Sequence, residues 1–197
     1  MIRARAKWRI RSDGKGGFDL RLPADERELL RDLPARLASA LDELGAEDEI
    51  PEPLRRLFPI AHPRNPNAQA NFDSVSRAEL LEHHRDALAC LERTADASHV
   101  SAEEMEGWLA GLNDLRLVLG SSLGVTEEMD EPDPNGPRYA DWLCYHYLSY
   151  LAGEVVEVLT GVLPPPDPTA DGLVPDDPWG EPLGGLRWDG TPVPGEP

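Results

Sequence analysis

The chain has 197 residues, 40% of them hydrophobic, and carries a formal net charge of -18. This length and apolar content predict one folded domain with a sizeable core. The acidic balance argues against a protein whose whole surface binds nucleic acid, because an acidic surface repels phosphate. No apolar run approaches the roughly 18 residues of a membrane helix, and no signal-peptide pattern follows the basic N-terminus, so we expect a cytoplasmic protein without membrane contact.

The first 22 residues form a basic segment on this acidic protein. Polar and apolar residues alternate on both sides of the turn sequence SDGKGG, which predicts a two-stranded antiparallel β-hairpin over 3–22. We expect its apolar face to dock on helices through Trp8, Ile10, Phe18 and Leu20. The cationic face is a candidate interaction surface made of Arg3, Arg5, Lys7, Arg9 and Arg11.

Leucine spacing and capping signals predict helices over most of the remaining chain. An amphipathic helix is expected over about 24–44, with Pro34 kinking or splitting it. Capping boxes beginning at Ser76 and Ser101 predict the starts of two further helices, the second ending at Gly120.

A last helix is predicted over about 138–160, and its apolar face makes it the most buried element. From residue 164 onward the composition changes, with ten prolines and a net charge of -6 in 34 residues, which predicts a disordered tail. The predicted fold is mainly α. It consists of one domain over 1–163, with the hairpin and a bundle of four to five helices over 24–160, and an acidic Pro/Gly-rich tail over 164–197.

The segment WLAGLNDLRLVLGSSLGV, residues 108–125, is rich in leucine but contains three polar residues: Asn113, Asp114 and Arg116. On a helical wheel Arg116 falls in the apolar sector, so it should point inward and need a partner, whereas Asp114 lies nearly opposite. Two carboxylates compete for Arg116. A simple antiparallel register with the last helix favours Asp141, and Glu154 is the alternative. We interpret the cluster as structural, with a ligand-binding role as the alternative.

The cysteines and histidines give no sign of a metal or disulfide site. Cys90 and Cys144 lie in apolar helical patterns, so we expect reduced, buried thiols. His83 and His84 would point about 100° apart on a helix and could not both face one ion, so a solvated charged face is expected there.

A polar-aromatic stripe on the last helix contains Trp142, His146 and Tyr150. It is a candidate surface for a partner or for a second copy in a homodimer, and a ligand pocket or plain packing is the alternative. No nucleophile elbow, P-loop, dinucleotide fingerprint or zinc spacing occurs. We therefore predict no catalytic residue, cofactor or metal, and a protein that is not an enzyme.

Four features together resemble a known family. They are the 108–125 segment, Asp141-Trp142-Leu143 opening the last helix, the upstream PLRRLFPIAH, and the basic hairpin with its tryptophan. Over roughly residues 5–160 the chain resembles the AosR-like oxidative-stress transcriptional regulators of actinobacteria, long known only as a domain of unknown function. The resemblance implies a cytoplasmic, non-enzymatic regulator tied to oxidative stress and to sulfur or cysteine metabolism. Such a protein would act through contacts with the transcription machinery.

Three classes of function follow from these observations. The leading hypothesis is a regulator that works by protein–protein contact. A nucleic-acid-binding module using the basic hairpin is a second class, although the negative body leads us to expect no direct DNA binding. The third class is a helical protein that binds a small ligand.

Overall fold

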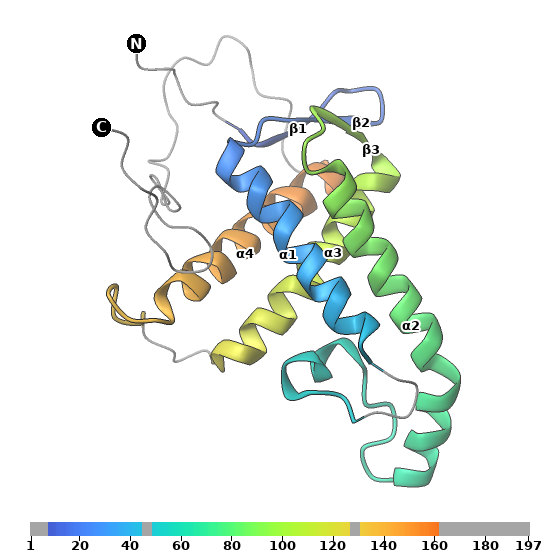
Figure 1. The fold of residues 1–197 in the computed structure, drawn as a ribbon. Helices are drawn as coiled ribbons and strands as arrows, with labels where there is room; N and C mark the ends of the chain where they lie inside the picture. Colours follow the sequence, from blue (N-terminus) through green and yellow to red (C-terminus); the bar gives the residue numbers. More distant parts are fainter. Residues whose placement is uncertain (1–7, 45–48, 127–130, 162–197) are drawn as a thin grey trace, which may run out of the picture.

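The computed structural model describes residues 8–44, 49–126 and 131–161. Four long helices pack around one core (Figure 1), and a short 3₁₀-helix lies between the first two of them in chain order. The elements are α1 (Ala24–Asp42), η1 (Glu52–Leu57), α2 (Pro66–Thr94), α3 (Ala102–Leu123) and α4 (Tyr139–Thr160). The predicted mainly α fold with an N-terminal strand pair is confirmed. Our expectations for residues 1–7 and for the tail after 161 lie outside the described residues.

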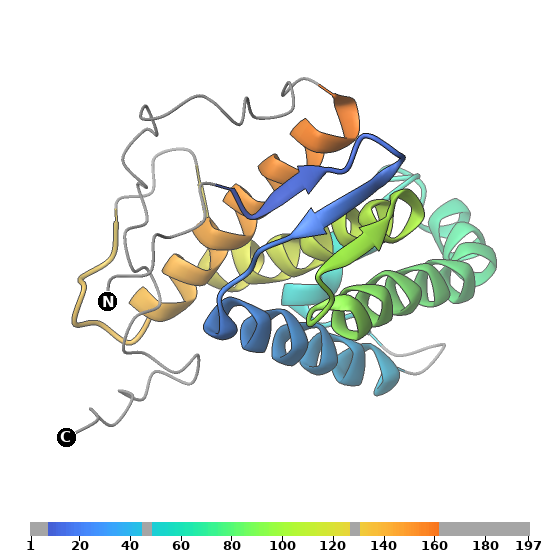
Figure 2. The same cartoon turned by 90° about the horizontal axis from the view of Figure 1, so that it is seen from above.

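A small antiparallel sheet covers one end of the bundle, above α3 and α4 (Figure 2). Strands β1 (Ile10–Ser12) and β2 (Gly17–Leu20) form the predicted hairpin, with Ile10 opposite Leu20. A third strand that was not predicted from the sequence, β3 (His99–Ser101), pairs with the other edge of β2. Three residues are too few to show the alternation that predicts a strand.

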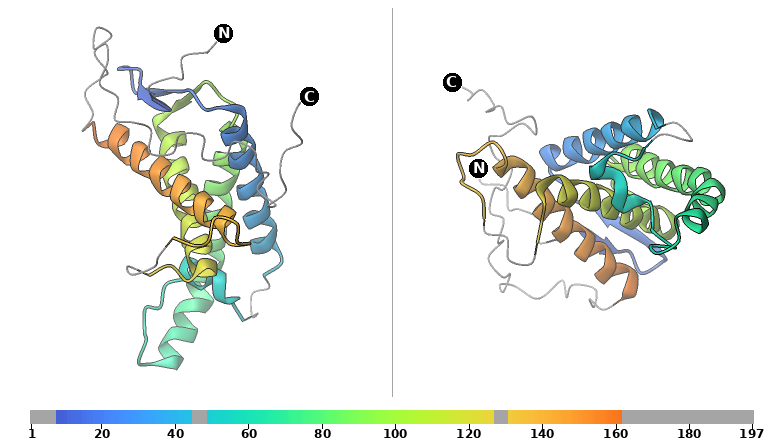
Figure 3. Two further views of the ribbon diagram at one scale, coloured as in Figure 1. Left: turned by 90° about the vertical axis from the view of Figure 1, so that its left-hand side faces the viewer. Right: turned by 90° about the horizontal axis from the view of Figure 1, so that it is seen from below.

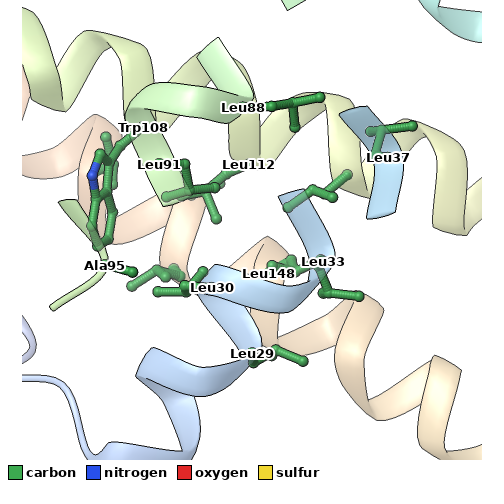
Figure 4. Packing of buried hydrophobic residues seen from close by; sticks show 14 of the residues in the cluster. Leu29, Leu30, Leu33, Leu37, Leu88, Leu91, Ala95, Trp108, Leu112 and Leu148 are labelled. Carbon is green, nitrogen blue, oxygen red and sulfur yellow. The ribbon is translucent and has the colours of Figure 1, made fainter. Parts of the chain in front are cut away.

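The core contains buried side chains from all four long helices (Figure 4), and Trp108 on α3 is its largest fully buried residue. The Trp108 indole Nε1 donates a hydrogen bond to Thr94 Oγ1 at 2.7 Å. The Thr94 hydroxyl in turn donates to the Cys90 carbonyl at 2.6 Å. The Trp108 ring is fully buried, and its one polar atom has a hydrogen-bond partner. Further fully buried side chains come from α1, α2, α3 and α4: Leu30, Leu41, Leu88, Leu91, Met105, Leu112, Tyr147, Leu148, Leu151 and Val155.

Two glycines let α3 approach α2 closely. A Cβ atom at Gly111 would lie 3.0 Å from the Ala87 carbonyl oxygen, and one at Gly107 would lie 2.9 Å from Cys90 Sγ. Both distances are shorter than a comfortable carbon contact. The two glycines, one helical turn apart, therefore determine how closely these helices pack.

Two helix boundaries differ from the prediction. Helix α2 begins at Pro66, where the Asn65 side chain accepts from the Ala68 amide, and not near Ser76. Its N-terminal half extends beyond the bundle (Figure 3) and contains no buried residue before Leu81, so no apolar stripe marked it in the sequence. The capping box at Ser101 is confirmed.

Two residues that were expected to interrupt or end a helix lie inside one. Helix α1 covers Ala24–Asp42, close to the predicted 24–44, and is not split at Pro34. Helix α3 continues past Gly120 and ends at Gly124, whose φ of 63° is the left-handed conformation that glycine adopts readily.

A buried ion pair anchors the sheet to the helices. Arg9 Nη2 and Nε donate to the two carboxylate oxygens of Glu26 on α1, each at 2.8 Å. The Tyr147 hydroxyl on α4 donates to the same carboxylate at 2.9 Å. Burial by itself lowers the pKa of Arg9, but the hydrogen bonds and charge of Glu26 outweigh it and raise that pKa. The prediction that Arg9 faces outward is wrong, because the chain bends before β1 and turns this side chain toward α1.

Replacing Glu26 with glutamine should destabilise the protein strongly, because the Arg9 guanidinium would remain largely buried without its counter-charge. Removing one partner of such a pair costs about 3 kcal/mol or more. Urea denaturation measures the change in the free energy of unfolding. Asp25→Asn alters the neighbouring exposed carboxylate and should change stability by less than about 0.5 kcal/mol. Equal effects of the two substitutions would contradict a structural role for the ion pair.

Candidate functional site

Asp114, one of the three polar residues in the leucine-rich segment, forms an ion pair inside the core. His84 Nδ1 on α2 lies 2.7 Å from Asp114 Oδ2, and His84 Nε2 lies 3.0 Å from the Leu57 carbonyl oxygen. The pair therefore joins α2, α3 and the end of η1. The prediction that His84 lies on a solvated face is wrong, since only 8% of this residue is exposed.

Both ring nitrogens of His84 face acceptors, and only the imidazolium form can donate to both of them. Burial alone lowers the pKa of His84. The hydrogen bond and charge of Asp114, together with the hydrogen bond to the Leu57 carbonyl, outweigh that effect and raise the pKa. A histidine whose pKa is raised by folding stabilises the fold in its protonated, charged form.

Arg116 does not point into the core as predicted. It is half-buried, and its Nε donates to Ser149 Oγ on α4 at 2.9 Å. Ser149 lies about two turns further along α4 than Asp141. The simple register was wrong because a long connection between residues 124 and 138, and not a tight turn, joins the two helices.

The two carboxylates predicted for Arg116 lie elsewhere. Asp141 is half-exposed in the first turn of α4 and forms no ion pair with a described residue. Glu154 accepts a hydrogen bond from the Tyr150 hydroxyl at 2.7 Å, near the Arg9 network. Burial raises the pKa of Glu154 despite that hydrogen bond and the charge of Arg9. Of the five residues predicted as one polar cluster, Asp114, Asp141 and Glu154 therefore lie in three separate places in the fold.

Arg116 and Asn113 instead line a surface groove between η1, α3 and α4, with a volume of about 450 Å³. We call it the arginine groove. The sequence analysis missed its second arginine, Arg56. A signal was present in PLRRLF, because Leu54 and Leu57 are buried and the arginines between them face solvent. The arginine groove is lined by Arg56, Asn113, Arg116, Leu117, Gly120, Val125, Thr126 and Tyr145.

A second groove, of about 670 Å³, lies between α1, η1, α3 and α4. Its lining is dominated by aliphatic side chains, and the charged groups among the described lining residues are Arg36, Glu43 and Glu49. We call it the leucine groove. Its aliphatic lining comes chiefly from Leu33, Leu37, Leu44, Leu54, Leu115, Val118, Leu119 and Leu148.

The basic hairpin surface is only partly described, because Arg3, Arg5 and Lys7 lie outside the described residues. Arg11 pairs with Asp19 at 3.1 Å. The guanidinium groups of Arg11 and Arg21 lie 4.5 and 4.3 Å from the centre of the Trp8 ring. Trp8 is therefore half-buried beneath arginines and does not dock into the core as predicted.

The docking of the rest of the hairpin is confirmed. The remaining three apolar residues of the predicted face are buried: Ile10, Phe18 and Leu20.

Aromatic residues of α4 pack against one another along the helix. Trp142 packs against His146, with ring centres 4.1 Å apart, and stacks on Tyr139 at 5.9 Å. Burial lowers the pKa of His146. Tyr150 follows His146 by about one turn, and the Arg9 guanidinium lies 5.5 Å from the centre of its ring.

Both cysteines are free thiols, which confirms that they form no disulfide with each other. Cys144 is buried, and burial raises its pKa to about 12. Cys90 is half-buried and not fully buried as expected, and burial raises its pKa as well. Neither thiol is therefore activated as a thiolate at neutral pH.

Within residues 8–44, 49–126 and 131–161, no three histidine, cysteine or acidic side chains are grouped so that they could hold a metal ion. A search of the same residues finds no helix long and apolar enough to span a membrane.

The His84–Asp114 pair makes stability depend on pH in a predictable direction. Because the folded-state pKa of His84 is raised above the ordinary value of about 6.5, its contribution is fully present below that pH. It is lost as the pH rises through the folded-state pKa. Urea denaturation across a pH series should show this loss, and His84→Gln should remove it while lowering stability at acidic pH by about 3 kcal/mol.

The neighbouring exposed histidine provides the control for that measurement. His83→Gln should leave both the stability and its pH dependence close to those of the parent. Parallel pH profiles for the parent and His84→Gln would contradict the assignment of the charge to His84.

The sequence of the chain matches a known protein family. A family model described as a domain of unknown function, DUF2017, matches residues 4–159. No curated protein and no solved structure matches with significance. The matched range extends from the hairpin almost to the end of α4 and includes both grooves. The chain belongs to the DUF2017 family.

Proposed function

We propose that this protein is a non-enzymatic, cytoplasmic regulator that acts by protein–protein contact in oxidative-stress-linked transcription, particularly of sulfur or cysteine metabolism. The link to oxidative stress rests on the sequence resemblance to AosR-like regulators. The contact mode rests on one observation, the leucine groove. Much of its aliphatic lining belongs to the core, and Leu44, Val118 and Leu119 are the partly exposed part of it. Apolar side chains exposed together in this way are typical of binding sites for other molecules.

The shape and charge of the leucine groove indicate what binds there. Aliphatic side chains from α1, η1, α3 and α4 form its walls, an arrangement that suits the apolar face of an amphipathic helix. Its charged lining residues are two glutamates and one arginine, and the chain as a whole is strongly acidic. The proposed occupant is therefore a leucine-bearing segment of a transcription protein, with basic residues flanking its apolar face.

Direct binding of DNA by the hairpin has less support. Arg9 is bound to Glu26, and Arg11 is paired with Asp19. Side chains engaged in this way must give up their partners before they contact phosphate. The acidic body adds long-range repulsion.

A charge placed in the leucine groove should weaken binding of the proposed partner. Val118 on α3 lines the groove and is half-buried, so Val118→Glu would set a carboxylate against the apolar face of the partner. The affinity of the protein for this partner should fall at least about tenfold. The measurement is quantitative mass spectrometry of RNA polymerase subunits that co-purify with the tagged full chain from oxidant-treated cells of its native host.

Ala89→Glu adds the same charge at an exposed position of α2 outside the groove and should leave co-purification unchanged. Oxidant-induced transcription of sulfur-metabolism genes should be lost only with Val118→Glu. The proposal fails if no polymerase subunit accompanies the parent protein at any oxidant level. It also fails if both variants behave alike.

A further inference from the structure

Two arginines face the arginine groove, and no carboxylate of a described residue balances them. Arg116 donates through Nε to Ser149, and its two Nη nitrogens form no hydrogen bond to any residue that the structure describes. Arg56 is exposed on η1 and likewise has no ion pair within the described ranges. Among residues 8–44, 49–126 and 131–161, none that lines the groove is acidic.

The chain has 37 acidic residues, and several of its arginines pair with them. Even Arg55, the sequence neighbour of Arg56, pairs with Glu49 and Glu52. Other arginines on the helices also have acidic partners, in the pairs Arg31–Asp96, Arg85–Asp42 and Arg93–Glu104. A groove with two arginines and no acidic lining residue is a local positive site on a negative surface, which attracts anions.

We propose that the arginine groove binds a small molecule that carries a phosphate or carboxylate group. A guanidinium offers parallel N–H donors that match the oxygens of either group. The Ser149 hydroxyl donates to the Tyr145 carbonyl at 2.7 Å, which leaves its oxygen to accept from Arg116 Nε at 2.9 Å. Arg116 is thus oriented before any ligand arrives, which lowers the entropy cost of binding.

The remaining lining residues suit the organic part of such a molecule. Asn113 and Thr126 supply neutral hydrogen-bonding groups, while Leu117 and Val125 supply apolar contact. A Cβ atom at position 120 would lie 3.1 Å from the Tyr145 ring, so Gly120 lets this ring pack close to α3. The volume of about 450 Å³ lies within the range of small-molecule sites.

This inference goes beyond the proposed function and does not depend on it, because the two grooves share no lining residue. Inorganic pyrophosphate and citrate serve as probes for the two anion chemistries. Isothermal titration calorimetry of the full chain, at a fixed ionic strength of about 0.15 M, should show saturable binding of at least one probe.

Substitutions at the two arginines test whether binding occurs in this groove. Arg56→Ala and Arg116→Ala should each weaken binding at least about tenfold. Arg116→Lys keeps the charge but loses the planar fork, so it should also weaken binding while leaving the circular dichroism spectrum unchanged. Arg55→Ala, the matched control beside the groove, should change the affinity by less than about twofold.

Each outcome of the calorimetric titrations either supports or overturns the proposed anion site. Binding of pyrophosphate alone identifies a phosphorylated ligand, and binding of citrate alone identifies a carboxylate ligand. Binding of both supports a general oxyanion site. The absence of saturable binding of either probe overturns the proposal. Equal weakening by Arg55→Ala and Arg56→Ala overturns it too, since diffuse surface charge would then account for the binding.

Discussion

The ion pair between His84 and Asp114 fixes the rotation of α3, and the surfaces of the molecule follow from that rotation. Two charges taken out of water are stable only when they meet each other with good geometry, so Asp114 must face α2. At about 100° per residue, Asn113, Arg116, Leu117 and Gly120 then lie on one flank of the helix. Leu115, Val118 and Leu119 lie on the opposite flank. These two flanks are the walls that α3 contributes to the arginine groove and the leucine groove.

Helix α4 completes both grooves and thereby connects them. Tyr145 lines the arginine groove, and Leu148, about one turn further, lines the leucine groove. Ser149 on the same helix orients Arg116. The Glu26 carboxylate in turn joins α4 to α1 and the sheet through Tyr147 and Arg9. Any contact that shifts α4 against α3 therefore moves a wall of each groove.

The sequence predicted those features that local patterns determine. The capping box at Ser101, the hairpin turn and the leucine stripes of the helices depend on neighbours in the chain, and these were found. The partners of Arg116, Asp114 and Arg9 depend on how distant elements pack, and helical periodicity carries no information about that. Arg116 shows the limit most clearly. The wheel placed it in an apolar sector, but the edge of that sector meets Ser149 and a surface groove instead of the core.

The protonation state of the His84 ring tests most directly whether a buried ion pair fixes α3. Nitrogen-15 NMR of the histidine side chains through a pH titration distinguishes an imidazolium, with both ring nitrogens protonated, from a neutral ring with one bare nitrogen. If the pair forms as described, the His84 ring in the folded protein loses its proton only at a pH above the ordinary histidine pKa of about 6.5. A His84 ring that becomes neutral at or below that pH would contradict the charged pair and remove the electrostatic basis for the rotation of α3.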